Sequence, residues 1–207
     1  MAERSGAITK TSRENKVLPT TKDDILDGLL AHMLSKAAEK EIEFDVTVVG
    51  DISGMAELIP ALNMQTLYAD LIENAIIATS HSEYRRMLIT IGMEQGFYEL
   101  KIQDTGIPFK IETLLNLGKQ KASTHLDEGG SGIGYMTVFE MLHECKASII
   151  ITEHEEKQFG FTKSVTVRFD GLDEYIVQTY RAEEIQALSA GAGRYPLIRQ
   201  ITAVVSG

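Results

Sequence analysis

The segment from Met64 to Ile102 constrains the fold of this chain more than any other part of it. Apolar residues recur at helical spacing from Met64 to Ser80, which predicts a long helix with one buried face. Met87 to Met93 and Phe97 to Ile102 then alternate around the break Glu94-Gln95-Gly96, which predicts a β-hairpin. A one-sided helix and a one-sided hairpin must bury their apolar faces, so we expect helices packed on a sheet.

Similar patterns occur on both sides of this segment. Helical spacing begins after Thr21, and Thr21 with Asp24 resembles a capping box at the start of a first helix. We also expect strands at 42–48, 149–151, 165–169 and 175–180, and helices at 111–117 and 135–144. These elements predict a two-layer α/β sandwich, with a mixed, mostly antiparallel sheet and about three helices on one face.

Composition limits the partners and the location of the protein. The 207 residues include 20 Lys and Arg against 30 Asp and Glu, a net charge of −10 that disfavours binding to nucleic acid or an anionic membrane. With one cysteine, Cys145, no internal disulfide forms. The longest uncharged run, Leu58 to Ala69, is too short for a bilayer, which takes about 20 residues. The first ten residues lack the apolar core of a signal peptide, so we expect a cytoplasmic protein.

A pair of oxygen-bearing side chains lies on the polar face of the Met64–Ser80 helix. Asp70 and Asn74 are four residues apart, so their side chains are neighbours, whereas Glu73 points elsewhere. Carboxylate and amide oxygens are the ligands that Mg²⁺ takes together with water and phosphate. The alternative is a solvated polar face without a ligand.

Asp104 and Gly106 follow the hairpin directly, in the sequence Asp-Thr-Gly-Ile-Pro. A carboxylate at a strand end can accept a hydrogen bond from an exocyclic amine of a ligand, and a glycine lets the backbone approach closely. The alternative is an Asp-Gly turn.

A glycine-rich run, Gly129 to Gly134, precedes the helix expected at 135–144. Backbone amides at the start of a helix form an anion site, which predicts phosphate binding here. The spacing fits neither a P-loop nor a dinucleotide-binding fingerprint, and the alternative is a flexible connection.

The order of these motifs resembles the ATP-binding domain of the GHKL, or Bergerat-fold, superfamily, and within it the catalytic domain of bacterial sensor histidine kinases. Leu71 to Ala75 is similar to the superfamily's N box, Asp104 to Gly106 to its G1 box, and Gly130 to Gly134 to its G2 box. The resemblance covers about 22–171 and implies a tail or linker at 1–20 and an ATP-binding domain at 21–181. The role of residues 182–207 stays open.

The resemblance also implies roles for individual residues. Asn74 would coordinate Mg²⁺, Asp104 would bind the adenine amino group, and Gly106 would lie beneath the adenine. The polar segment between G1 and G2 would form a lid over ATP, with a lysine that neutralises phosphate charge. The phosphate-binding residues implied here are Lys119, Lys121, Thr124, Gly130, Gly132, Ile133 and Gly134.

The resemblance implies transfer of the γ-phosphoryl group from ATP to a histidine on another segment or chain, followed by a response regulator as partner. Any homodimer would form through an upstream segment. His32 lacks the acid that usually follows a phosphoacceptor histidine, so we expect the acceptor elsewhere. Asp70 stands where the chaperone and topoisomerase ATPases carry a catalytic Glu, and it could orient a water.

Two departures keep other functions open. Ile77 replaces the basic residue that often follows the N-box Asn by three positions, and no F box is evident. The alternatives are an anti-sigma-factor-type protein serine kinase with the same pocket, and a non-catalytic module that binds nucleotide and signals through its lid.

Overall fold

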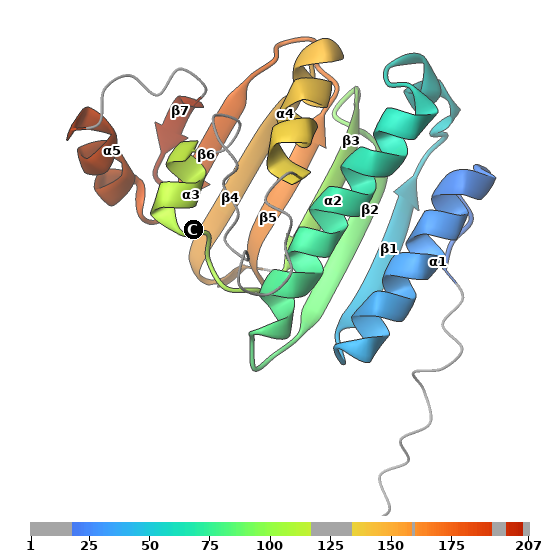
Figure 1. Cartoon of the computed structure of the whole chain (residues 1–207), viewed down its shortest axis with the longest axis horizontal. Helices are drawn as coiled ribbons and strands as arrows, with labels where there is room; N and C mark the ends of the chain where they lie inside the picture. Colours follow the sequence, from blue (N-terminus) through green and yellow to red (C-terminus); the bar gives the residue numbers. More distant parts are fainter. Residues whose placement is uncertain (1–17, 117–133, 159, 192–197, 205–207) are drawn as a thin grey trace, which may run out of the picture.

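The computed structural model describes residues 18–116, 134–158, 160–191 and 198–204, which form two layers (Figure 1). Seven strands form one sheet in the order β1-β2-β3-β5-β4-β6-β7. The strands are β1 Glu43–Val49, β2 Arg86–Glu94, β3 Phe97–Asp104, β4 Ser148–Gln158, β5 Phe161–Arg168, β6 Tyr175–Thr179 and β7 Ile198–Thr202. The helices are α1 Asp24–Glu39, the short 3-10 helix η1 Ser53–Glu57, α2 Ala61–Ser80, α3 Ile111–Asn116, α4 Gly134–Glu144 and α5 Ala182–Gly191. Helices α1, α2 and α4 lie along one face of the sheet (Figure 1).

The sheet is mixed, as the sequence predicts. Strands β2, β3, β5 and β4 pair antiparallel in its centre, whereas β1 at one edge and β6 and β7 at the other pair parallel to their neighbours. The β2–β3 hairpin closes with Glu94 opposite Phe97. Gln95 and Gly96 between them both have positive φ angles, 53° and 90°, which suits the right-handed twist of a two-residue hairpin. The predicted two-layer α/β sandwich is therefore confirmed.

Helix α1 begins differently from the sequence prediction. Asp23 is its N-cap, and the carboxylate accepts hydrogen bonds from the backbone N–H groups of Ile25 and Leu26. The hydroxyl of Thr21 donates instead to Asp27, at 2.6 Å. The capping box of Thr21 and Asp24 is wrong because Asp23 can reach the free amides two and three residues ahead of it.

Helix α2 has the predicted buried face. Its residues Leu67, Tyr68, Leu71, Ile72, Ala75, Ile76 and Thr79 are all buried against the sheet and the flanking helices. The helix begins at Ala61, three residues before the predicted Met64 and directly after Pro60, which is its N-cap. Within the described part of the chain, no helix is long and apolar enough to span a membrane.

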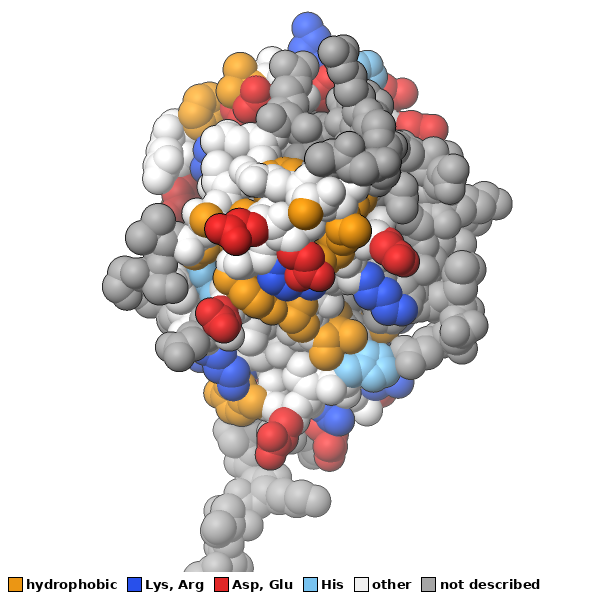
Figure 2. All heavy atoms as spheres, turned by 90° about the vertical axis from the view of Figure 1, so that its left-hand side faces the viewer, with side chains coloured by type: hydrophobic (Ala, Val, Ile, Leu, Met, Phe, Trp, Pro, Cys, Tyr) orange, Lys and Arg blue, Asp and Glu red, His pale blue; other side chains and the backbone are white. Residues whose placement is uncertain are grey.

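The C-terminal residues, which the sequence leaves unassigned, extend the sheet. Strand β7 pairs parallel with β6, and α5 joins the two. Ile185 of α5 is fully buried, whereas Leu188 is half exposed. Figure 2 shows this end of the molecule, where hydrophobic side chains lie exposed between acidic and basic ones.

Candidate functional site

Asp70 and Asn74 lie one turn apart on α2, and both are partly exposed as predicted. Glu73 points away from this face, because its carboxylate forms an ion pair with Lys36 of α1 at 2.7 Å. Partial burial raises the pKa of Asp70 above its ordinary value, and the nearby charge of Glu73 raises it further. Asp70 therefore holds a proton more readily than an exposed carboxylate does.

Asp104 is the last residue of β3, and its side chain is completely buried. Oxygen Oδ1 accepts a hydrogen bond from the backbone N–H of Gly106 at 2.7 Å. The same oxygen lies 3.2 Å from the ammonium group of Lys163, which is also buried. Oxygen Oδ2 is buried and has no hydrogen-bond partner. Because an unpaired buried acceptor is costly, Oδ2 is a candidate acceptor for a ligand donor.

The charge state of Asp104 depends on opposing influences. Burial raises the pKa of this carboxyl above its ordinary value, because it disfavours the charged form. The positive charge of Lys163 and the N–H of Gly106 oppose that rise. The hydroxyl of Thr79 on α2 also opposes the rise in the pKa of Asp104, although it lies near the carboxylate without a hydrogen bond of standard geometry.

Gly106 lies where the chain passes the end of α2. A Cβ atom at this position would lie 2.8 Å from the carbonyl carbon of Ala78 and 2.6 Å from Oδ1 of Asp104. The backbone N–H of Ile107 donates to the carbonyl of Ala78 at 3.4 Å. Only glycine allows this close approach, which places the backbone beside the buried carboxylate.

The segment after Gly106 is held by buried charged groups of the neighbouring strands. The ammonium group of Lys163 donates to the carbonyl of Ile107. Glu153 of β4, which is also buried, accepts from the N–H of Phe109 at 2.7 Å. Arg181, which follows β6, donates to the carbonyl of Phe109 at 2.8 Å and to Glu153 at 2.6 Å. We call residues 105–110 the base loop, because they follow the carboxylate predicted to bind the base.

Sequence reasoning missed Lys163, Glu153 and Arg181. The alternation of side chains along a strand could have revealed two of them, because Glu153 and Lys163 continue the inward-facing positions of β4 and β5. They also lie opposite each other in the register. A charged residue at such a buried position needs a partner, and in this chain the partners belong to segments that are distant in the sequence.

Of the remaining predicted site residues, the structure describes Gly134. Gly134 begins α4, which packs beside α2 over the sheet (Figure 1). Lys119, Lys121, Thr124, Gly130, Gly132 and Ile133 lie outside the described residues. In the described ranges, no group of three or more His, Cys, Asp or Glu side chains could hold a metal ion.

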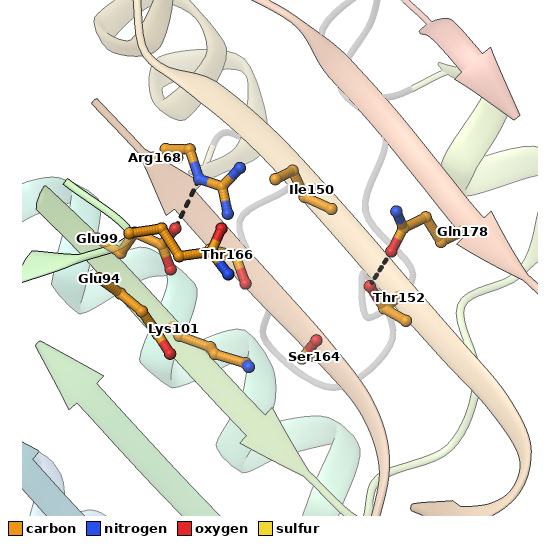
Figure 3. A pocket seen from close by; sticks show the side chains of 10 residues that line it. Glu94, Glu99, Lys101, Ile150, Thr152, Ser164, Thr166, Arg168 and Gln178 are labelled. Carbon is orange, nitrogen blue, oxygen red and sulfur yellow. Dashed lines mark hydrogen bonds and ion pairs between the residues drawn. The ribbon is translucent and has the colours of Figure 1, made fainter. Parts of the chain in front are cut away.

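A second recess lies on the opposite face of the sheet (Figure 3). Its volume is about 250 Å³, and polar side chains of β3, β4, β5 and β6 line it. Two of its charged groups pair with each other, since Arg168 donates to Glu99 at 2.6 Å. Thr152 likewise donates to Gln178 at 3.0 Å. These satisfied contacts make the recess a weaker candidate than the buried, unpaired carboxylate oxygen of Asp104.

Comparison with known proteins identifies the fold. No protein-family model matches the sequence, and no curated protein sequence matches it significantly. Among solved structures, the catalytic domain of the histidine kinase ThkA matches with a TM-score of 0.54 and 14% identity, over 72% of this chain and 91% of that domain. Another crystal form of the same domain matches with a TM-score of 0.51 and 14% identity, over the same shares of the two chains. The mycobacterial sensor histidine kinase MprB aligns with a TM-score of 0.49 and 15% identity, over 69% of this chain and 93% of that one.

The ThkA matches establish that this chain has the fold of a histidine kinase catalytic domain, as the three motifs predict. At this level of identity, the match concerns the fold, and the function must be argued from the site.

Proposed function

We propose that this chain is a Mg-ATP-binding catalytic domain of a histidine kinase, which transfers the γ-phosphoryl group of ATP to a histidine on another segment or chain. The observation that carries the proposal is the buried, unpaired Oδ2 of Asp104 in a chain with the histidine kinase catalytic fold. A neutral partner that donates a single hydrogen bond, such as the adenine amino group, satisfies this oxygen.

Residues around Asp104 fit the base of a nucleotide. Gly106 lets the backbone pass directly beside the carboxylate, and the base loop is anchored at both Ile107 and Phe109. A pre-formed loop of this kind binds with a smaller loss of conformational entropy.

The phosphate end of the site is assigned to other residues. Asn74 would contribute its amide oxygen to Mg²⁺, and Gly134 would contribute the start of α4, whose N-terminus favours an anion. The lysines Lys119 and Lys121, Thr124 and the backbone of Gly130, Gly132 and Ile133 would complete this end. Mg²⁺ supplies positive charge that offsets the charge developing on the phosphoryl oxygens. Asp70, one turn before Asn74, would orient the attacking group or a metal-bound water.

We further propose a cytoplasmic location and a histidine-bearing acceptor domain with a response regulator as partners. The same pocket would also serve an anti-sigma-factor-type protein serine kinase. The product distinguishes them, because a phosphoramidate on histidine is hydrolysed in acid whereas a phosphate ester on serine survives. Ile77, partly exposed three residues after Asn74, supports instead a non-catalytic nucleotide-binding module, because it cannot neutralise phosphate.

Calorimetric titration with Mg-ADP and Mg-ATP tests the proposal. We expect binding to the native chain and loss of at least about tenfold in affinity for Asp104→Asn, whose amide cannot act as a charged acceptor. Asp24→Asn is the matched control, because Asp24 is exposed in the first turn of α1 and should leave binding unchanged. Absence of binding to the folded native chain would refute the proposed function.

Substitution of Asn74 tests the metal assignment separately. We expect Asn74→Ala to remove the Mg²⁺ dependence of ATP affinity while the domain stays folded, because Asn74 is partly exposed and carries no packing role. The measurement is ATP affinity with and without Mg²⁺. An unchanged Mg²⁺ effect in the variant would place the metal elsewhere.

A further inference from the structure

The strongest unassigned feature of the molecule is the lysine beside the base-binding carboxylate. Lys163 extends from β5 beneath the helices, and its side chain is 3% exposed. Its ammonium group contacts Oδ1 of Asp104 and the carbonyl of Ile107, and lies 5.2 Å from the centre of the Phe109 ring. These three partners hold the ammonium group in place, because a movement of the group would break its contacts with them.

Lys163 contacts one carboxylate oxygen of Asp104 and makes no contact with the other. Oxygen Oδ1 receives both the ammonium group and the N–H of Gly106, whereas Oδ2 receives neither. The residues that act on this carboxylate are Gly106 of the base loop, Thr79 on α2 and Lys163 on β5. Of these three, Lys163 carries the charge that compensates the carboxylate.

We infer that Lys163 is a positioning residue that holds Asp104 ionised, with Oδ2 free as a pure acceptor, and thereby selects nucleotides whose base presents an N–H donor over those that present a carbonyl. This inference rests on the proposed function. An ionised carboxylate accepts hydrogen bonds and donates none, whereas a protonated one donates through its O–H. The ionisation state of Asp104 therefore determines which base edge it can pair with.

The inference predicts a change of base preference when the lysine is removed. Adenine presents an amino group at the position where hypoxanthine presents a carbonyl oxygen. With Lys163 in place, Asp104 repels that carbonyl. In Lys163→Met, burial is no longer opposed by the lysine charge, so the pKa of Asp104 rises further and its carboxyl becomes protonated. The protonated carboxyl can donate a hydrogen bond to a carbonyl, so the repulsion that weakens binding of hypoxanthine decreases.

The test compares Mg-ADP with Mg-IDP by calorimetry between about pH 5 and about pH 9. We expect the native chain to prefer ADP by at least about tenfold at neutral pH. In Lys163→Met, ADP affinity should fall by at least about tenfold at neutral pH and recover as the pH rises. The ratio of ADP affinity to IDP affinity at neutral pH should decrease. A residue with a merely structural role would lower the affinity for both nucleotides at every pH.

Lys101→Met is the matched control. Lys101 belongs to β3 but lies on the opposite face of the sheet, in the polar recess (Figure 3). The same substitution there should leave the affinities, the pH profile and the base preference unchanged.

A measurement on the native chain covers the case in which Lys163→Met does not fold. The side-chain carboxyl carbon of Asp104, assigned through Asp104→Asn, reports its ionisation by nuclear magnetic resonance. We expect the ionised form at neutral pH, and a protonated carboxyl would overturn the inference. Nucleotide binding with an unchanged pH profile in Lys163→Met would also overturn it, whereas absence of nucleotide binding to the native chain refutes the proposed function instead.

Discussion

Gly106 of the base loop has no space for a side chain. The atoms within 3 Å of a Cβ placed there belong to the backbone of Ala78, the carboxylate of Asp104 and the ammonium group of Lys163. The two charged groups are buried and the third neighbour is backbone, so none of them can move aside easily.

We therefore expect Gly106→Ala to lower the free energy of unfolding by about 1–3 kcal/mol and to weaken ADP binding. Chemical denaturation and calorimetry measure the two effects. Gly28→Ala is the control, because nothing lies within 4 Å of its Cβ position and it is inside α1. That variant should gain about 0.5–1 kcal/mol from the preference of a helix for alanine. Equal stability of the two variants would contradict the close approach at Gly106.

Asp70 permits a prediction about pH. Its pKa is raised in the folded chain, chiefly by burial, so it becomes protonated at a higher pH than an ordinary carboxyl. If it accepts a proton during phosphoryl transfer, the rate falls as the pH drops through that raised pKa. We expect Asp70→Asn to lower kcat by about 10²–10⁴-fold with little change in ADP affinity. Measuring kcat and KM against pH checks this, and a change in KM alone would assign Asp70 to binding.

At the scale of elements, the base loop depends on strands that come later in the chain. Arg181 and Glu153 form a buried ion pair, and both also bind the backbone of Phe109. Both partners are therefore needed to keep the loop against the sheet.

Removing one member of this pair leaves the other uncompensated. We expect Arg181→Met to cost about 3–5 kcal/mol of unfolding free energy, because Glu153 is 1% exposed. Lys36→Met breaks the exposed pair with Glu73 and should cost less than about 1 kcal/mol. Thermal and denaturant unfolding distinguish the two. A small effect of Arg181→Met would show that water reaches Glu153.

The elements that the sequence predicts well are those with strong periodicity. Helix α2 and the β2–β3 hairpin follow from local patterns, since apolar spacing alone specifies which face is buried. Asp104 and Gly106 were recognised because a turn motif places them next to each other in sequence. Lys163 and Arg181 were missed because their partners are distant along the chain, and a local pattern does not record contacts between strands.

At the scale of the whole molecule, the sheet does not end at residue 181. Strand β7 pairs with β6, while Ala182 and Ile185 of α5 are buried in the same core. The C-terminal residues therefore contribute to stability, whatever further role they have.

Deletion of residues 182–207 tests that contribution. We expect the melting temperature to fall, because burial of the Ile185 side chain alone is worth about 1.5–3 kcal/mol and β6 would become an exposed edge. Calorimetric melting measures the change. An equal melting temperature after the C-terminal deletion would make 21–181 a self-sufficient unit.

The position of Arg181 has a practical consequence for handling the protein. This residue connects β6 to α5 and also holds the base loop, so a displacement of α5 would also move a contact of the site proposed to bind nucleotide. A fluorescent protein or an immobilisation tag fused after residue 207 should therefore disturb ligand measurements. The same fusion placed before residue 1 precedes α1 in the sequence, which none of these contacts reaches, so biosensors and surface-binding assays are best attached there.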